Sequence, residues 1–165
     1  MTEREKKIFR YGILVGELEA ISKFNTKTDH IYDFQLKHLQ KLETINKSIE
    51  NIVIDISETY ELKKIAIPDT FNFLFKLLHD KWFYSYQNKN EYHLSDNGNN
   101  FSLYIDDWKK EWIEDFVNFL LETLRPINFY EIIYINLKQY YESDYDEFIF
   151  ECDDELYYFK LAVSD

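Results

Sequence analysis

The segment from Tyr140 to Asp165 holds nine carboxylate side chains, five tyrosines and one lysine. Carboxylates at this density can bind a divalent cation, act as general acid and base, or attract a basic partner. Tyrosine adds a large ring and a polar hydroxyl, and it is enriched in protein interfaces. The spacing of these residues, and the elements that carry them, decide among the three kinds of chemistry.

Calcium is the first candidate, because carboxylates alternate along this segment. Asp144, Asp146 and Glu155 match positions one, three and twelve of an EF-hand loop, but apolar residues stand where an oxygen ligand and a glycine are needed. Zinc requires closely spaced cysteines and histidines. The four histidines have no such spacing with one another or with Cys152. We predict no metal site and no cofactor.

Catalytic patterns are equally incomplete. Asp55 and the pair Glu61-x-Lys63 are reminiscent of the carboxylates and lysine that position magnesium in many nucleases, although an acidic nuclease would repel its substrate. Cys152 alternates with phenylalanines, which predicts a buried and inert thiol. The three glycines form neither of the glycine-rich phosphate-binding motifs. We predict no catalytic residue, and hence a protein that is not an enzyme.

The excess negative charge lies in the second half of the chain. The formal net charge is −12 at pH 7; residues 1–90 carry +1 of it and residues 91–165 carry −13. Clustered like charges cost stability through self-repulsion, but they steer basic partners and repel nucleic acid and anionic membranes. An acidic surface that only keeps the protein soluble is the alternative, and scattered charge would serve that purpose equally well.

Apolar residues at three- and four-residue spacing predict a mainly helical, near-neutral half over residues 1–90. The three expected helices are Thr2–Phe24, a longer one from about Ile31 to Ile56, and Phe71 to about Tyr84. The end of the long helix is ambiguous, because the β-branched alternation of residues 52–56 also suits a strand. Its apolar stripe leaves a homodimer open.

Residues 91–165 are expected to be mixed and strongly acidic. Asn97-Gly98, in a polar loop between two short apolar runs, predicts a β-hairpin within residues 91–105. A helix from Asp106 to Leu124 follows, and then an antiparallel sheet of about three strands with one face on the helices and one face in water. The strands are Phe129–Leu137, Glu147–Cys152 and Leu156–Val163. The prediction is one α+β domain over residues 1–165.

The compartment is predicted from what the sequence lacks. A single cysteine permits no disulfide within the chain, the first residues do not resemble a signal peptide, and no apolar run approaches the length of a membrane span. We expect a cytoplasmic protein that contacts neither membrane nor nucleic acid directly.

The tyrosines of the C-terminal segment cannot all be core residues. Tyr158 opposes Tyr157 on the last predicted strand, and Tyr140, Tyr141 and Tyr145 lie in a connection. We predict that exposed rings and surrounding acids form a docking face for a basic protein partner. The predicted contact residues are Tyr140, Tyr141, Glu142, Asp144, Tyr145, Asp146, Glu147, Asp153, Asp154, Glu155 and Tyr158.

In its small size, acidity and aromatic content, the chain resembles toxin-neutralising immunity proteins, which block effectors made by neighbouring bacteria. The resemblance implies an inhibitor that neutralises a basic toxin or effector by occluding it. A phage-type anti-defence protein or nucleic-acid mimic is the alternative, and it predicts an extended row of carboxylates instead of a compact patch. An uncharacterised enzyme is the second alternative, which a deep pocket containing His79 and His93 would favour.

Overall fold

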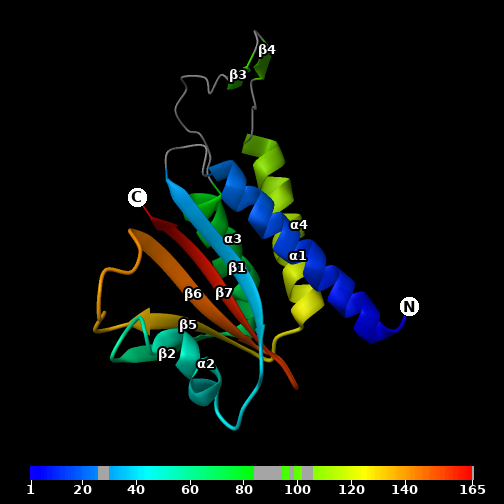
Figure 1. The fold of residues 1–165 in the computed structure, drawn as a ribbon. Helices are drawn as coiled ribbons and strands as arrows, with labels where there is room; N and C mark the ends of the chain where they lie inside the picture. The colour runs from blue at the N-terminus through cyan, green and yellow to red at the C-terminus, as the bar shows by residue number, and fades with distance from the viewer. Residues whose placement is uncertain (26–29, 84–93, 97–98, 102–105, 165) are drawn as a thin grey trace.

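A five-stranded antiparallel sheet forms the centre of the computed structural model, which describes residues 1–25, 30–83, 94–96, 99–101 and 106–164. The strand order is β1-β7-β6-β5-β2, so that the first and second strands of the chain lie at opposite edges (Figure 1). The strands are β1 (Ile31–Leu39), β2 (Tyr60–Ile65), β5 (Asn128–Tyr134), β6 (Asp144–Glu151) and β7 (Leu156–Ser164).

Helices cover both faces of this sheet. One face carries α1 (Glu3–Asn25), α4 (Asp106–Leu124) and α3 (Thr70–Leu77), which continues into the π-helical turn η3 (Leu78–Trp82). A 3-10 turn, η2 (Ile67–Asp69), precedes α3, and the other face carries α2 (Ile45–Val53). A separate hairpin pairs β3 (Leu94–Asp96) with β4 (Asn99–Phe101). None of the helices in the described ranges combines the length and apolarity that a membrane span requires.

The main core lies between the sheet and the α1/α3/α4 layer. Side chains of a strand alternate between its faces, so Phe148 and Phe150 of β6 point to the same layer as Phe159 of β7. All three are fully buried, and the register places Phe148 directly opposite Phe159. The ring of Phe129 stacks on that of Phe150 at 4.6 Å. This packing confirms the apolar face that the sequence predicts for the last two strands.

A smaller core fills part of the second face. Ile149 of β6 and Tyr158 of β7 pack there with Ile49 and Val53 of α2, and all four are buried. The prediction that this face meets water is wrong for this region, because α2 turns back over the sheet. The sequence pattern assigned α2 to a long helix and so left nothing to cover the second face.

The long helix predicted from Ile31 to Ile56 is wrong. Residues 31–39 alternate with a period of two: Phe34 and Leu36 face the main core, while Asp33 and Gln35 lie on the other side. Pairing along the whole length of β7 holds this segment extended. The helix α2 begins only after Thr44, whose side chain accepts a hydrogen bond from the backbone N–H of Lys47 and so caps it.

The strand β2 was not predicted. Glu61, Lys63 and Lys64 are exposed on it, and charged side chains are typical of an edge strand that is protected against pairing with other chains. The ambiguous residues 52–56 contain no strand: Ile52 and Val53 end α2, and a turn follows. The α+β class is therefore confirmed, but the sheet has five strands, and two of them, β1 and β2, lie in the first half of the chain.

The remaining elements follow the predicted pattern. The first helix, the helix from Asp106 and the three C-terminal strands are present with boundaries shifted by a few residues. The hairpin is confirmed by the pairing of β3 with β4, although its Asn97-Gly98 loop lies outside the described residues. The predicted end of the third helix at Tyr84 also lies outside them.

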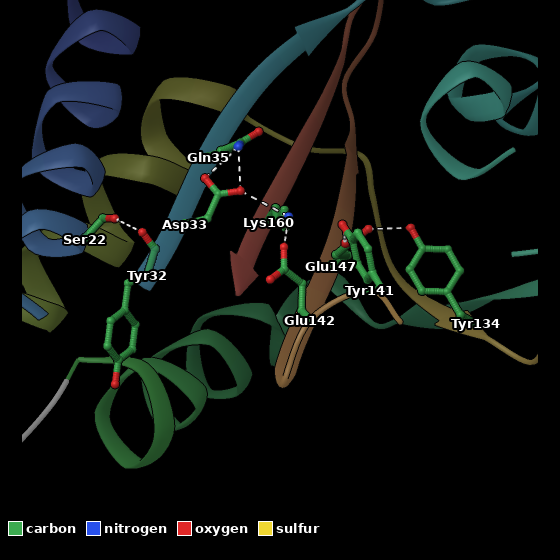
Figure 2. Close-up of polar contacts among 9 residues, drawn as sticks. All are labelled: Ser22, Tyr32, Asp33, Gln35, Tyr134, Tyr141, Glu142, Glu147 and Lys160. Carbon is green, nitrogen blue, oxygen red and sulfur yellow. Dashed lines mark hydrogen bonds and ion pairs between the residues drawn. The ribbon is translucent and has the colours of Figure 1, made fainter. Parts of the chain in front are cut away.

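The outer edge of β1 is closed by side chains of α1. The Tyr11 hydroxyl donates a hydrogen bond to the Leu36 carbonyl at 2.7 Å and accepts one from the His38 N–H at 3.2 Å. The Ser22 hydroxyl donates to the Tyr32 carbonyl (Figure 2). Backbone groups that would otherwise form the open edge of the sheet are thus satisfied within the chain.

One carboxyl group in α1, by contrast, has an oxygen without a hydrogen-bond partner. The Oε2 atom of Glu17 is buried and has no hydrogen-bond partner, and burial raises the pKa of this carboxyl. Its ionised form is therefore less favourable in the folded protein than in the unfolded chain.

We predict that Glu17→Gln stabilises the protein at pH 7 by up to about 1 kcal/mol. Because the pKa of Glu17 is raised on folding, the wild-type penalty is complete above the folded-state pKa, shrinks as the pH falls below it, and is absent below the pKa of the unfolded chain. Thermal unfolding at pH 7 and pH 4 should show a higher melting temperature for the variant at pH 7 and a smaller difference at pH 4. An advantage of equal size at both pH values would contradict this explanation.

Candidate functional site

The candidate site lies where β6 begins, beside the end of β7 and the start of β1 (Figure 2). At its centre is Glu147 of β6, whose side chain is fully buried. The Tyr134 hydroxyl donates a hydrogen bond to one of its carboxylate oxygens, and the Tyr141 hydroxyl donates to the other, both at 2.5 Å. Such charge-assisted hydrogen bonds compensate for the loss of hydration of a buried carboxylate. We call these three residues, with Lys160, the tyrosine–carboxylate network.

Aromatic rings shield this carboxylate. The rings of Tyr134, Tyr141 and Tyr145 contact one another with centroid distances between 5.3 and 6.0 Å. Tyr134 ends β5, Tyr141 lies in the connection to β6, and Tyr145 is the second residue of β6. The turn of the chain between β5 and β6 therefore places all three rings around Glu147.

Lys160 supplies the positive charge of the network. It lies on β7 directly opposite Glu147 in the strand register and is buried. Its ammonium group forms ion pairs with Glu142 at 2.9 Å and with Asp33 at 3.1 Å, and lies 4.8 Å from the centre of the Tyr141 ring. Asp33 also accepts a hydrogen bond from the side-chain amide of Gln35 (Figure 2). One ammonium group is thus shared by two carboxylates from different elements.

The pKa values in the network oppose proton transfer near neutral pH. Burial, and then the charge of Glu147, raises the pKa of Tyr134, Tyr141 and Tyr158. Burial alone would lower the pKa of Lys160, but its bonds to Glu142, Tyr141 and Asp33 outweigh burial and raise it. The raised pKa keeps the Lys160 ammonium group charged near neutral pH and therefore held in its ion pairs.

The thiol of Cys152 behaves as the sequence predicts. The residue is buried, and burial raises its pKa to about 11. A thiol with such a raised pKa carries little thiolate at neutral pH and is a weak nucleophile.

A second lysine, Lys81, forms ion pairs with two carboxylates on the face of the sheet that α1, α3 and α4 cover. The Lys81 ammonium group lies 2.9 Å from a carboxylate oxygen of Asp144 and 2.7 Å from one of Asp146. The indole N–H of Trp82 also donates to Asp146, at 2.6 Å. Lys81 and Lys160 therefore both bind carboxylates near the beginning of β6, one lysine on each face of the sheet.

The remaining predicted acids lie at the other end of β6. Asp153 and Asp154 are exposed in the turn between β6 and β7. Glu155 forms an ion pair with Lys7 of α1 and accepts a hydrogen bond from the Tyr157 hydroxyl at 2.8 Å. The predicted contact residues thus form two groups at opposite ends of the strand, and not one patch.

The predicted contact residues also differ in how far they are exposed to solvent. Glu147 and Tyr158 are buried, with at most 2% of either residue exposed, so the folded protein does not present them to a partner. Tyr141, Glu142, Tyr145 and Asp146 are partly buried. Tyr140 is 71% exposed and Asp144 is also exposed.

Four participants were missed by sequence reasoning: Asp33, Lys81, Tyr134 and Lys160. The alternation of Asp33 and Gln35 with apolar neighbours is the signal that would have placed Asp33 on a strand. The two lysines carry no local signal, because strand pairing and the η3 turn bring them to β6.

The enzyme alternative predicts a deep pocket that contains His79 and His93. A surface hollow of about 400 Å³ is lined by Asn46, Glu58, Thr59, Tyr60 and Leu62, and contains no histidine. His79 pairs with its neighbour Asp80 at 2.9 Å, and His93 lies outside the described residues. Across the described ranges, no three side chains of His, Cys, Asp or Glu gather as metal ligands.

The chain matches no protein-family model, no curated protein and no solved structure. The functional interpretation therefore depends on the chemistry of the residues themselves.

We predict that breaking the tyrosine–carboxylate network destabilises the fold. Glu147→Gln replaces one acceptor oxygen by an NH₂ group and should lower the free energy of unfolding by about 1.5–3 kcal/mol, because a buried hydroxyl loses its charged partner. Tyr141→Phe should lower it as well, and the double variant should lose less than the sum of the two single losses, because both changes remove the same hydrogen bond. Urea denaturation measures all three.

Tyr140→Phe is the matched control, since this neighbouring tyrosine is exposed and its hydroxyl contacts Ser143 instead of Glu147. It should leave the urea midpoint unchanged. Equal effects of Tyr140→Phe and Tyr141→Phe would contradict the structural role given to Glu147.

Proposed function

We propose that the protein is a small acidic inhibitor that binds a basic protein partner at the beginning of β6, in the manner of a bacterial immunity protein. One observation carries the proposal: Lys81 and Lys160 are each shared by two carboxylates at this place. The four carboxylates are Asp33, Glu142, Asp144 and Asp146, and they leave a surplus of negative charge that the lysines do not neutralise.

Part of this surplus negative charge is exposed to solvent next to an exposed tyrosine. The side chain of Asp144 is 55% exposed, and Tyr140 is the most exposed of the predicted tyrosines. An exposed carboxylate steers a cationic partner and raises its association rate, while a tyrosine supplies contact area at low entropic cost. Tyr140 and Asp144 are therefore the contacts we assign first, with partly exposed Tyr141 and Tyr145 beside them.

Inhibition by occlusion is the mechanism that suits these residues. A basic toxin or effector whose active surface is rich in lysine and arginine would be covered by a protein of net charge −12.

The test is co-expression with the product of the adjacent open reading frame. The proposal expects that this product alone arrests growth, that co-expression restores growth, and that the two proteins co-purify. A harmless neighbour that does not co-purify would count against the proposal. Displacement of the bound partner by added DNA or RNA would favour the mimic instead.

We predict that Tyr140→Ala combined with Asp144→Asn weakens binding of the co-purified partner by about 10- to 100-fold, through loss of an anchor and of steering charge. Stopped-flow association should become slower and less dependent on salt, while the melting temperature stays close to wild type. The control is Asp153→Asn with Asp154→Asn, which removes more charge at the far end of β6. A larger effect of the control pair would show that the partner contacts the far end of β6, and would contradict the proposal.

A further inference from the structure

The outward face of α1 is apolar along its middle. Ile8, Phe9 and Ile13 are exposed there, at 61%, 62% and 37%. At 100° per residue, Gly12 and Gly16 project from the same side of the helix, whereas Leu14 and Leu18 on the opposite side are fully buried in the main core. Exposed apolar side chains next to one another on a helix are typical of an interaction surface.

Two glycines leave a gap between the side chains on this face of α1. A Cβ atom added at Gly12 or at Gly16 would meet no other atom within 4 Å, so nothing in the described part of the chain packs over these positions. The absence of side chains there allows another helix to approach closely. In Figure 1, α1 lies on the outside of the helical layer.

Charged residues border the apolar face at both ends, in complementary order. Glu5 and Lys6 lie at the N-terminal end, and Glu19 and Lys23 at the C-terminal end. In an antiparallel pair of such helices, Glu5 at one end comes near Lys23 of the other copy, because both residues project from the same side of α1. In a parallel pair, each residue would meet its own like charge, which is unfavourable.

We propose that the protein forms a two-fold symmetric homodimer in which α1 packs antiparallel against α1 of a second copy. When Phe9 lies opposite the partner subunit's Gly16, the two residues are only about 20° apart around the helix, so the Phe9 ring meets a glycine hollow. Glu5 is then three residues, about 4.5 Å along the axis, from the partner subunit's Lys23, on the same side of the helix.

The present ion pairs of these residues do not oppose such contacts. Lys6 binds Glu3 and Lys23 binds Glu19 within α1, with most of each side chain exposed. Exposed pairs three or four residues apart stabilise a helix only weakly, so they can be exchanged for contacts between subunits. This inference is independent of the proposed inhibitor function, because it uses a different surface.

Analytical ultracentrifugation of the full chain at 0.15 M salt tests the proposal. The expected mass is twice the 20.3 kDa of one chain at micromolar concentrations, and Phe9→Glu or Ile13→Glu should weaken the dimer at least 10-fold. Ile127→Glu is the matched control, because this isoleucine is 48% exposed but lies between α4 and β5. A monomer at 100 µM, or a dimer that resists both α1 variants, would overturn the proposal.

Cysteine cross-linking tests the orientation, since the one native thiol is buried. Ile13→Cys lies near the two-fold axis and should form an intersubunit disulfide under mild oxidation, whereas Ala20→Cys should not. Disulfides in both variants would indicate a parallel pair and contradict the model of two opposed helices. Glu5→Lys and Lys23→Glu should each weaken the dimer, and their combination should restore it; failure of that rescue would exclude the proposed register.

Discussion

The burial of one negative charge, that of Glu147, constrains much of this structure. A carboxylate without water around it must be surrounded by donors, and Tyr134 and Tyr141 fill that role at its two oxygens. These tyrosines come from the end of β5 and from the connection that follows. The chain between β5 and β6 thus brings two hydroxyl groups to one carboxylate, and Lys160, which pairs with Glu142 and Asp33, lies directly opposite Glu147 on the neighbouring strand.

The same acids that give the surface its charge also hold the fold together. Asp146 binds Lys81 and the Trp82 indole, which attaches η3 to β6, while Glu142 and Asp33 hold Lys160 between β1 and the connection before β6. Structure and charge are therefore coupled at this end of the sheet. Only residues such as Asp144 and Tyr140, which are mainly exposed, can change without altering the interior.

Sequence patterns predicted the elements whose periodicity is unambiguous. The alternation of phenylalanines in β6 and β7 and the apolar stripes of α1 and α4 were sufficient to place them. The pattern failed for β1 because leucines at 36 and 39 fit a helical stripe as well as an alternating one, and only pairing with β7 decides between them. At the candidate site, the sequence identified the acids but not their lysines, because those contacts join residues far apart in the chain.

The closed edge of β1 has a consequence for how the protein is made. This strand pairs with β7, which follows it by more than a hundred residues in the chain. The hydrogen bonds between the two strands can form only after β7 has been synthesised, and contacts of such sequence separation form slowly. During that interval Tyr11 and Ser22 of the helix synthesised just before it can already occupy its outer backbone groups. The N-terminal helix thus covers part of one edge of β1, while the other edge stays open until β7 pairs with it.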